Sequence, residues 1–204
     1  WNLHGELKAH REEPRKKMPI DAPGFALNAL TVRAFNSIRH DLKTMRSGPY
    51  RTHYEPFLYP LDAIAHWNRL YGVDGFYQYQ CVLPPATARD GTIELMRTIV
   101  MSGQGSPLAV LKDFGPNQPA GLLSFPMEGT TLAVDFRNQG EPTLKLMADL
   151  DRIVLEAGGR LYPAKDGRMG PEIFKAGYPR WSEFLRYVDP CFSSGLWRRV
   201  VAER

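Results

Sequence analysis

Cysteine is nearly absent from this chain of 204 residues, which contains only Cys81 and Cys191. Two cysteines cannot build a disulfide framework, and the five histidines lie scattered without the spacing of metal ligands. Neither a run of ~20 apolar residues nor a secretory signal peptide occurs. We therefore expect no bound metal, no transmembrane segment and a reducing, cytoplasmic location. Association with the surface of a membrane is compatible with these features.

A large excess of charge of one sign is also missing. The formal net charge is +4, the isoelectric point is about 9.1, and no basic helix carries interleaved aromatic residues. These features argue against a nucleic-acid-binding protein, so we expect no nucleic-acid partner. The one basic run, residues 10–19, mixes both signs and is interrupted by Pro14. Residues 1–23 are therefore interpreted as a polar linker or a partly disordered segment.

Motifs that cradle phosphate groups or activate a nucleophile are lacking as well. The chain has no phosphate-binding loop, no nucleophile elbow and no glycine-rich turn from a strand into a helix. It begins at Trp1 without a methionine, and we expect it to be part of a longer protein. Enough apolar material for a core is present, because 43% of the residues are hydrophobic and 11% are aromatic. We expect one domain over residues 24–204.

The periodicity of apolar residues predicts the order of helices and strands. Helices are predicted at residues 22–43, 59–72, 88–105 and 141–159, with short helices in 171–204. Strands are predicted at residues 75–84, 107–115, 130–136 and 160–164. The resulting order, β-α-β-β-α-β, indicates an α+β fold: a ferredoxin-like antiparallel sheet with both helices on one face, N-terminal helices before it and a C-terminal helical tail after it.

The same periodicity predicts which side chains share a helix face. In the first helix they are Leu27, Leu30, Ala34, Ile38 and Leu42. In the helix 88–105 they are Ile93, Met96 and Val100. In the helix 141–159 they are Leu144, Met147, Leu150 and Val154, which we expect to point inward.

Polar side chains within the predicted strands are the candidate site residues. Gln78 and Gln80 lie two residues apart and therefore on one face, where they form either a polar wall or simply a wet surface. Lys112 and Asp135 each interrupt an apolar strand. Each is either an outward-facing charge or half of an ion pair between neighbouring strands, which would form a charged element of a pocket.

Lys165 follows the last predicted strand, in the stretch GGRLYPAKDGR of residues 158–168. A lysine at such a place can position a hydroxyl group or stabilise developing negative charge. A solvent-exposed loop charge is the simpler interpretation of so short a motif. Residue types alone therefore indicate an α+β domain with a polar sheet face, and they do not decide the role of Lys165.

Two spaced motifs carry a resemblance to known proteins. The pattern PLD…WNR.YG..GF.QYQ ends at Gln80, and the pattern GGR.Y.AKD.R follows at residues 158–168. Between them lie LAVLKDFGP, LSFP and LAVDF. In this order, over residues 24–199, the chain resembles the C-terminal half of FAD-linked oxidases of the vanillyl-alcohol-oxidase superfamily. The resemblance is strongest to bacterial members that form the oxidase subunit of a polyprenyl-linked ribose 2-epimerase.

The resemblance implies a two-domain flavoprotein in which this chain is the substrate, or cap, domain over residues 24–204. No part of the chain matches the family's FAD-binding domain, which would be a partner within the same protein. The implied reaction oxidises a secondary alcohol of a sugar or a polyprenyl-linked sugar by hydride transfer to FAD, and the implied pathway adds a reductase partner. Without an FAD-binding domain, the chain is expected to be an inert module that binds a ligand or a partner.

The resemblance also implies roles for single residues. Lys165 matches a catalytic lysine beside the flavin and the reacting alcohol, and Tyr162 matches a tyrosine beside the flavin ring. The matches that line the substrate pocket are Gln78, Gln80, Lys112, Asp135 and Trp67, with Asn68 next to Trp67. Gly167 stands where many relatives have serine, and Leu58 and Tyr59 replace a more polar pair. Because changes in a pocket wall alter specificity more readily than reaction type, these differences leave the alcohol undetermined.

Overall fold

The computed structural model describes residues 16–24, 26–45, 48, 54, 64–117, 119–165 and 167–201. The predictions for residues 1–15, for Leu58 and for residues 59–63 lie outside the described residues.

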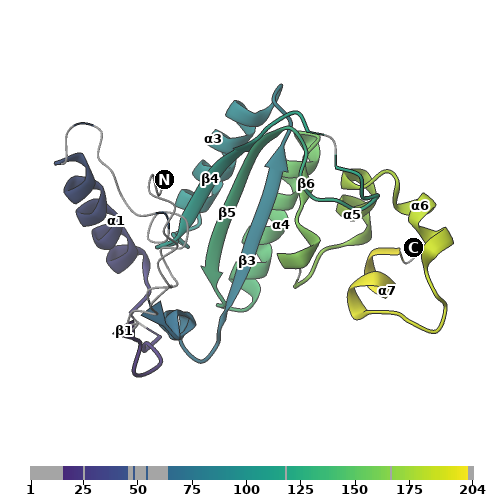
Figure 1. The fold of residues 1–204 in the computed structure, drawn as a ribbon. Coiled ribbons are helices and arrows are strands. Elements are labelled where there is room, and N and C mark those ends of the chain that lie inside the picture. The colour runs from purple at the N-terminus through teal and green to yellow at the C-terminus, as the bar shows by residue number, and fades with distance from the viewer. Residues whose placement is uncertain are drawn as a thin grey trace, which may run out of the picture.

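A four-stranded antiparallel sheet forms the centre of the molecule (Figure 1). Its strands are β3 (Phe76–Leu83), β4 (Ala109–Phe114), β5 (Gly129–Arg137) and β6 (Arg160–Leu161). They lie in the order β4-β5-β3-β6, so the first and third strands along the chain are central and the other two form the edges. All four predicted strands are present, although the last ends after two residues because Pro163 begins a 3-10 turn.

Two helices cover one face of this sheet, α3 (Ala88–Met101) and α4 (Glu141–Glu156) (Figure 1). The core lies between these helices and the sheet, which supplies alternate residues of β3 such as Tyr79 and Cys81. Helix α4 contributes Leu150 and Val154, both fully buried. Each such side chain contributes about 1.5–3 kcal/mol when removed from water. The predicted α+β class is confirmed, and so is the inward face of α4.

Helix α3 buries a different face from the one that its apolar pattern suggests. Its buried residues are Ala88, Leu95 and Ile99. Ile93, Met96 and Val100 do share a face, but they are 39%, 39% and 69% exposed. The reason is geometric: Leu95 and Ile99 are four residues apart and point to the sheet, so the neighbouring stripe turns toward solvent.

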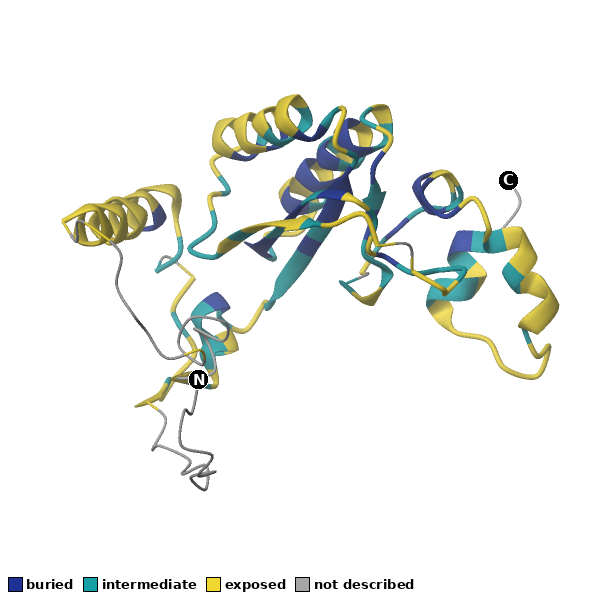
Figure 2. Ribbon diagram, turned by 45° about the horizontal axis from the view of Figure 1, so that its top comes forward, coloured by how far each residue is buried: buried dark blue, intermediate teal, exposed yellow. Residues whose placement is uncertain are grey.

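Helix α1 (Ala29–Thr44) lies at the edge of the molecule, beside the start of β4 (Figure 1). A capping box begins it, in which Asn28 accepts hydrogen bonds from the backbone of Leu30 and Thr31, and the Thr31 hydroxyl accepts one from the backbone N–H of Asn28. The predicted helix is present, but it begins at Ala29 and not at residue 22, so Leu27 precedes it, and among its residues only Val32 is buried. Its apolar stripe is exposed, as the predominantly yellow helix in Figure 2 shows.

The segment between α1 and β3 differs from the predicted helix of residues 59–72. In its described part, β2 (Ile64–Ala65) pairs in parallel with β1 (Lys16–Lys17), and only Trp67–Tyr71 is helical, as the 3-10 helix η1. His66 separates the two because its φ of 61° is left-handed, which ends any right-handed helix. Residues 18–22 also bond to this segment: Met18 donates to the carbonyl of Ala65 and Ala22 to that of Arg69.

The C-terminal tail consists of the short helices that the sequence predicts. They are α5 (Pro171–Gly177), α6 (Trp181–Phe184), the 3-10 turn η3 (Leu185–Tyr187) and α7 (Gly195–Val201). Helix α5 packs beside β6 and is fixed there by Tyr178, whose buried hydroxyl donates to the carbonyl of Leu161 over 2.6 Å. Phe174 contacts the ring of Trp197 edge-on, which joins α7 to α5.

A close approach at Gly159 yields a test of this packing. A Cβ atom there would lie 2.5 Å from the carbonyl oxygen of Val82, between β6 and β3. Gly159→Ala should therefore lower the free energy of unfolding by about 1–3 kcal/mol, measured by urea denaturation. Gly170→Ala is the matched control, because a Cβ atom at Gly170 meets nothing within 4 Å. Equal stability of the two variants would contradict this packing.

Candidate functional site

A hollow opens where β3 meets β6, and it brings four of the predicted site residues together. Gln78, Gln80, Tyr162 and Lys165 all line it. Gln78 and Gln80 come from the sheet face that the helices leave uncovered, since the alternate residues Tyr79 and Cys81 belong to the core. Tyr162 and Lys165 come from the turn after β6. The two glutamines are thus a polar wall with a lysine opposite, and not simply a wet surface.

The turn after β6 positions Lys165 through two backbone bonds. The N–H of Tyr162 donates to the carbonyl of Gln80 over 2.9 Å, and the N–H of Lys165 donates to the carbonyl of Tyr162 over 3.0 Å. This 3-10 turn, Pro163–Lys165, bends the chain back over β3. The Lys165 ammonium then donates to the Gln78 side-chain oxygen over 2.8 Å. Lys165 is half-buried and held in place, so it is not a solvated loop charge.

Aromatic packing holds the Tyr162 ring. Phe125 stacks on it at a centroid separation of 4.5 Å, and Phe125 itself is only 5% exposed. The edge of Phe114 contacts Phe125 at 6.0 Å, which ties this stack to β4. Offset aromatic pairs of this kind add about 0.5–1.5 kcal/mol beyond the burial of their area. Sequence reasoning did not assign a role to Phe125, which stands in the LSFP segment.

Behind the hollow, Asp135 links the glutamine wall to the N-terminal part of the chain. The register of β3 and β5 puts Asp135 directly opposite Gln78, and the Tyr71 hydroxyl donates to its carboxylate over 3.3 Å. Burial raises the pKa of Asp135, while hydrogen bonds from Gln78 and Tyr71 and the charge of Lys165 oppose that rise. A series of hydrogen-bonded side chains therefore runs from η1 to the hollow, in the order Tyr71, Asp135, Gln78, Lys165. Tyr71 was missed because its motif, WNRLYG, does not reveal where the ring points.

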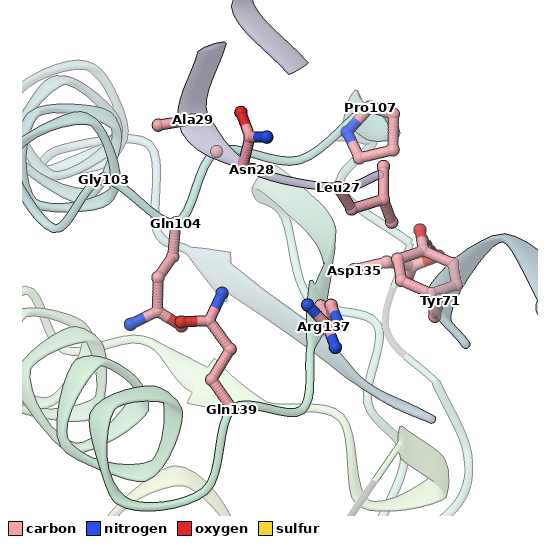
Figure 3. A pocket seen from close by; sticks show the side chains of 11 residues that line it. Leu27, Asn28, Ala29, Tyr71, Gly103, Gln104, Pro107, Asp135, Arg137 and Gln139 are labelled. Atoms are coloured by element: carbon pink, nitrogen blue, oxygen red, sulfur yellow. Dashed lines mark hydrogen bonds between the residues drawn. The ribbon is translucent and has the colours of Figure 1, made fainter. Parts of the chain in front are cut away.

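A second hollow lies on the other side of Asp135, between the start of α1, the turn after α3 and the end of β5 (Figure 3). Asp135 and Tyr71 line one side of it, and Gln104 and Gln139 line another (Figure 3). Polar groups that line this hollow already form hydrogen bonds with other parts of the protein. Gln104, for example, accepts a hydrogen bond from the buried Thr143 hydroxyl over 2.8 Å. Arg137 bonds to the carbonyl of Gly24 and to Asp74.

The structure does not bring Lys112 into this cluster. Lys112 pairs across the sheet with Thr131, four residues along β5 from Asp135, which is about 14 Å at strand rise. The ion pair between Lys112 and Asp135 that the sequence suggested is therefore wrong. Lys112 is exposed on an edge strand instead. The buried Thr131 beside it receives a hydrogen bond from the Gln80 amide over 3.3 Å, which fixes the orientation of that glutamine.

Trp67 lies with Tyr71 rather than with Lys165. Its ring contacts Phe76 at 5.4 Å and Tyr71 at 6.2 Å, and Tyr71 stacks on Phe76 at 4.4 Å. Trp67 thus supports the tyrosine that bonds to Asp135, while Asn68 is exposed. Gly167 lies beside the hollow, and a Cβ atom there would come within 3.1 Å of the Tyr77 ring. The glycine therefore lets this loop pack against Tyr77.

A half-buried ion pair anchors the loop that carries Lys165. Arg168, three residues on, donates two hydrogen bonds to the Asp151 carboxylate of α4, over 2.7 and 2.8 Å. The two side chains are 19% and 15% exposed, so water screens the pair only weakly. This arginine is part of the GGR.Y.AKD.R pattern, but the sequence alone did not reveal its partner. Among the described residues, no cluster of three metal-ligating side chains occurs and no helix is long and apolar enough to cross a bilayer.

Breaking this anchor should destabilise the protein. Arg168→Gln removes the charged partner of the Asp151 carboxylate and its two hydrogen bonds. We therefore expect the free energy of unfolding to fall by about 1.5–3 kcal/mol in urea denaturation. Arg152→Gln is the matched control from the next position of α4. Its bond to Glu156 is solvent-exposed and contributes only about 0.3–0.5 kcal/mol. Losses of the same size would show that the loop does not depend on the half-buried pair.

The buried carboxylate of Asp135 predicts a pH dependence. A carboxyl group whose pKa is raised by folding stabilises the native state while it is protonated, and this contribution is lost as the pH rises from the unfolded pKa to the folded one. Asp135→Asn keeps an acceptor for Tyr71 without the charge. The variant should therefore be more stable than the natural protein at neutral pH, and the difference should shrink as the pH falls toward 4. Urea denaturation across that range tests this, and a less stable variant at neutral pH would contradict it.

Comparison with known proteins confirms the resemblance indicated by the motifs. The chain is 42% identical to the decaprenylphosphoryl-beta-D-ribose oxidase of Mycolicibacterium smegmatis over 163 residues, which are 76% of this chain and 35% of that protein. It is 33% identical over 132 residues to an uncharacterized protein of Streptomyces coelicolor, again over 35% of the relative. No family model matches. The chain is thus a relative of decaprenylphosphoryl-beta-D-ribose oxidase, and its match spans about a third of the length of that protein.

Proposed function

We propose that this chain is the substrate-binding part of an FAD-dependent oxidoreductase that oxidises a secondary alcohol of a sugar. The observation that carries the proposal is the half-buried Lys165, held 2.8 Å from Gln78 in a hollow that Gln80 and Tyr162 also line. A relative with 42% identity is by name an oxidase of a decaprenylphosphoryl ribose, which supports an oxidoreductase role. From the name of that relative we infer that the substrate is a sugar or a polyprenyl-linked sugar.

The residues of the hollow fit a flavin ring and an alcohol. An ammonium has three N–H donors, of which Lys165 gives one to Gln78, so the same ammonium can also donate to a ligand. The Tyr162 ring, stacked on Phe125, provides a fixed aromatic wall at the same opening. A cation and an aromatic wall suit a planar ring that gains negative charge. Tyr162 and Lys165 would thus contact FAD from this side.

Alcohol oxidation needs the removal of a hydride from carbon and a proton from oxygen. FAD, when bound, supplies the hydride acceptor. Lys165 would donate a hydrogen bond to the hydroxyl oxygen, orient the adjacent C–H bond and stabilise negative charge on that oxygen while the O–H proton passes to solvent water. Gln78 would hold the ammonium in place through its side-chain oxygen, and Gln80, itself bonded to Thr131, would offer a fixed amide to the sugar.

A second domain would cover the sheet face that carries the two glutamines. Gln78 and Gln80 lie on the face opposite α3 and α4, and the hollow that they line is open. We propose the FAD-binding domain of the same protein for this position and a reductase as a separate partner in an epimerase-type pathway. Lys112 lies on the edge strand β4 and Trp67 on η1, both away from Lys165, and they would contact other parts of a longer substrate rather than the reacting carbon.

Flavin reduction in the full-length protein tests the proposal. Lys165→Ala should slow the anaerobic bleaching of the flavin by a sugar substrate about 10²–10³-fold, because a preorganised charge is lost at the reacting oxygen. Lys145→Ala, an exposed lysine of α4, is the matched control and should bleach normally. A full-length protein without flavin would overturn the proposed function and favour an inert binding module. Normal bleaching in Lys165→Ala would overturn only the role of the lysine.

A further inference from the structure

The outer side of α1 is an apolar stripe that no other described element covers. Its members are Leu30, Phe35, Ile38, Leu42 and the C-cap residue Met45, which are 75%, 48%, 60%, 62% and 80% exposed. At about 100° per residue, these side chains and Ala34 fall within an arc of roughly 140° on the helix. A single exposed leucine needs no explanation, but a whole helix face does.

The helix is attached to the protein through its opposite side. Val32 is its one buried residue and lies against Gly105, where a Cβ atom would approach its Cγ1 to 3.4 Å. Four residues on, the Asn36 amide donates to the carbonyl of Ser106 over 3.1 Å. Val32 and Asn36 therefore mark the inner side, and the stripe lies on the other side of the helix. Figures 1 and 2 show that α1 stands apart from the sheet and its two covering helices.

Positive charge accompanies the stripe. The helix carries three cations, Arg33, Arg39 and Lys43, and one anion, Asp41, so its formal charge is 3 − 1 = +2. All four of these residues are exposed. At the same 100° per residue, Arg33 and Arg39 lie on the two sides of the stripe, Lys43 lies on the inner side, and Asp41 lies within the arc of the stripe. An exposed apolar face bordered by cations is the pattern of helices that lie in the plane of a lipid surface, with the apolar side in the acyl boundary and the cations at anionic headgroups.

We propose that α1 docks this protein onto an anionic lipid surface. The proposal rests on the proposed function in one respect: a polyprenyl-linked substrate resides in a bilayer, so a docked domain would receive it there. The FAD-binding domain is the rival occupant of the stripe. In the proposed function that domain covers β3 and β6, where Lys165 lies. Helix α1 instead contacts Ser106, just before β4, and β4 is the opposite edge of the sheet. The positive charge also favours the lipid.

Co-sedimentation of the full-length protein with vesicles tests the proposal. We expect binding to vesicles of phosphatidylcholine with about one third phosphatidylglycerol, weaker binding to pure phosphatidylcholine, and a loss of affinity as salt is raised. The double variant Ile38→Glu/Leu42→Glu should bind the anionic vesicles at least about tenfold more weakly, because two apolar side chains that would enter the lipid become charged. Met101→Glu is the matched control, since Met101 is 86% exposed on α3 and should have no effect.

The fluorescence of a Leu42→Trp variant identifies the occupant of the stripe. A tryptophan that enters lipid should shift its emission to the blue only when anionic vesicles are added. Emission that is already blue-shifted without vesicles would show that another domain covers the stripe and would overturn the proposal, as would vesicle binding that survives Ile38→Glu/Leu42→Glu. Failure of the proposed function is separable, because Lys165→Ala impairs flavin reduction but should leave vesicle binding unchanged.

Discussion

The antiparallel pairing of β3 with β5 runs from Phe76 opposite Arg137 to Leu83 opposite Thr130, and both faces of the domain depend on its register. Directly paired residues point to the same side of a sheet. Tyr79 and Cys81 thereby join Val134 and Leu132 in the core beneath α3 and α4. A slip of one residue would turn this set to solvent, so the apolar face locks the register.

The same register builds the candidate site on the other face. It sets Gln78 opposite Asp135, and the edge pairing of Cys81 with Leu161 brings the turn after β6 to the end of this row. The Lys165 ammonium then meets Gln78, and the buried Asp135 meets Tyr71. Packing on one face and polar contacts on the other are thus consequences of one strand pairing. The ion pair of Arg168 with Asp151 couples the two, since it joins the loop after Lys165 to α4.

The N-terminal helix α1, by contrast, contributes little to the core. Helix α1 buries Val32 and leaves Leu30, Ile38 and Leu42 in water, which is unfavourable by about 25 cal/mol per Å² of apolar surface. A helix that contributes so little to the core is retained here by its capping box and by two contacts near Ser106. The apolar stripe is therefore not part of this core, and the proposed docking onto lipid would remove it from water.

Local patterns in the sequence determined the strands, the long helices and their order, because alternation and helical spacing are properties of neighbouring residues. They also placed Gln78 and Gln80 on one face. Tertiary structure alone decided which partners these residues meet: Tyr71 rather than Lys112 for Asp135, and Gln78 for Lys165. It also decided that α1 turns its apolar face outward. Register across strands and the direction of a helix depend on contacts between distant segments, which a single sequence does not reveal.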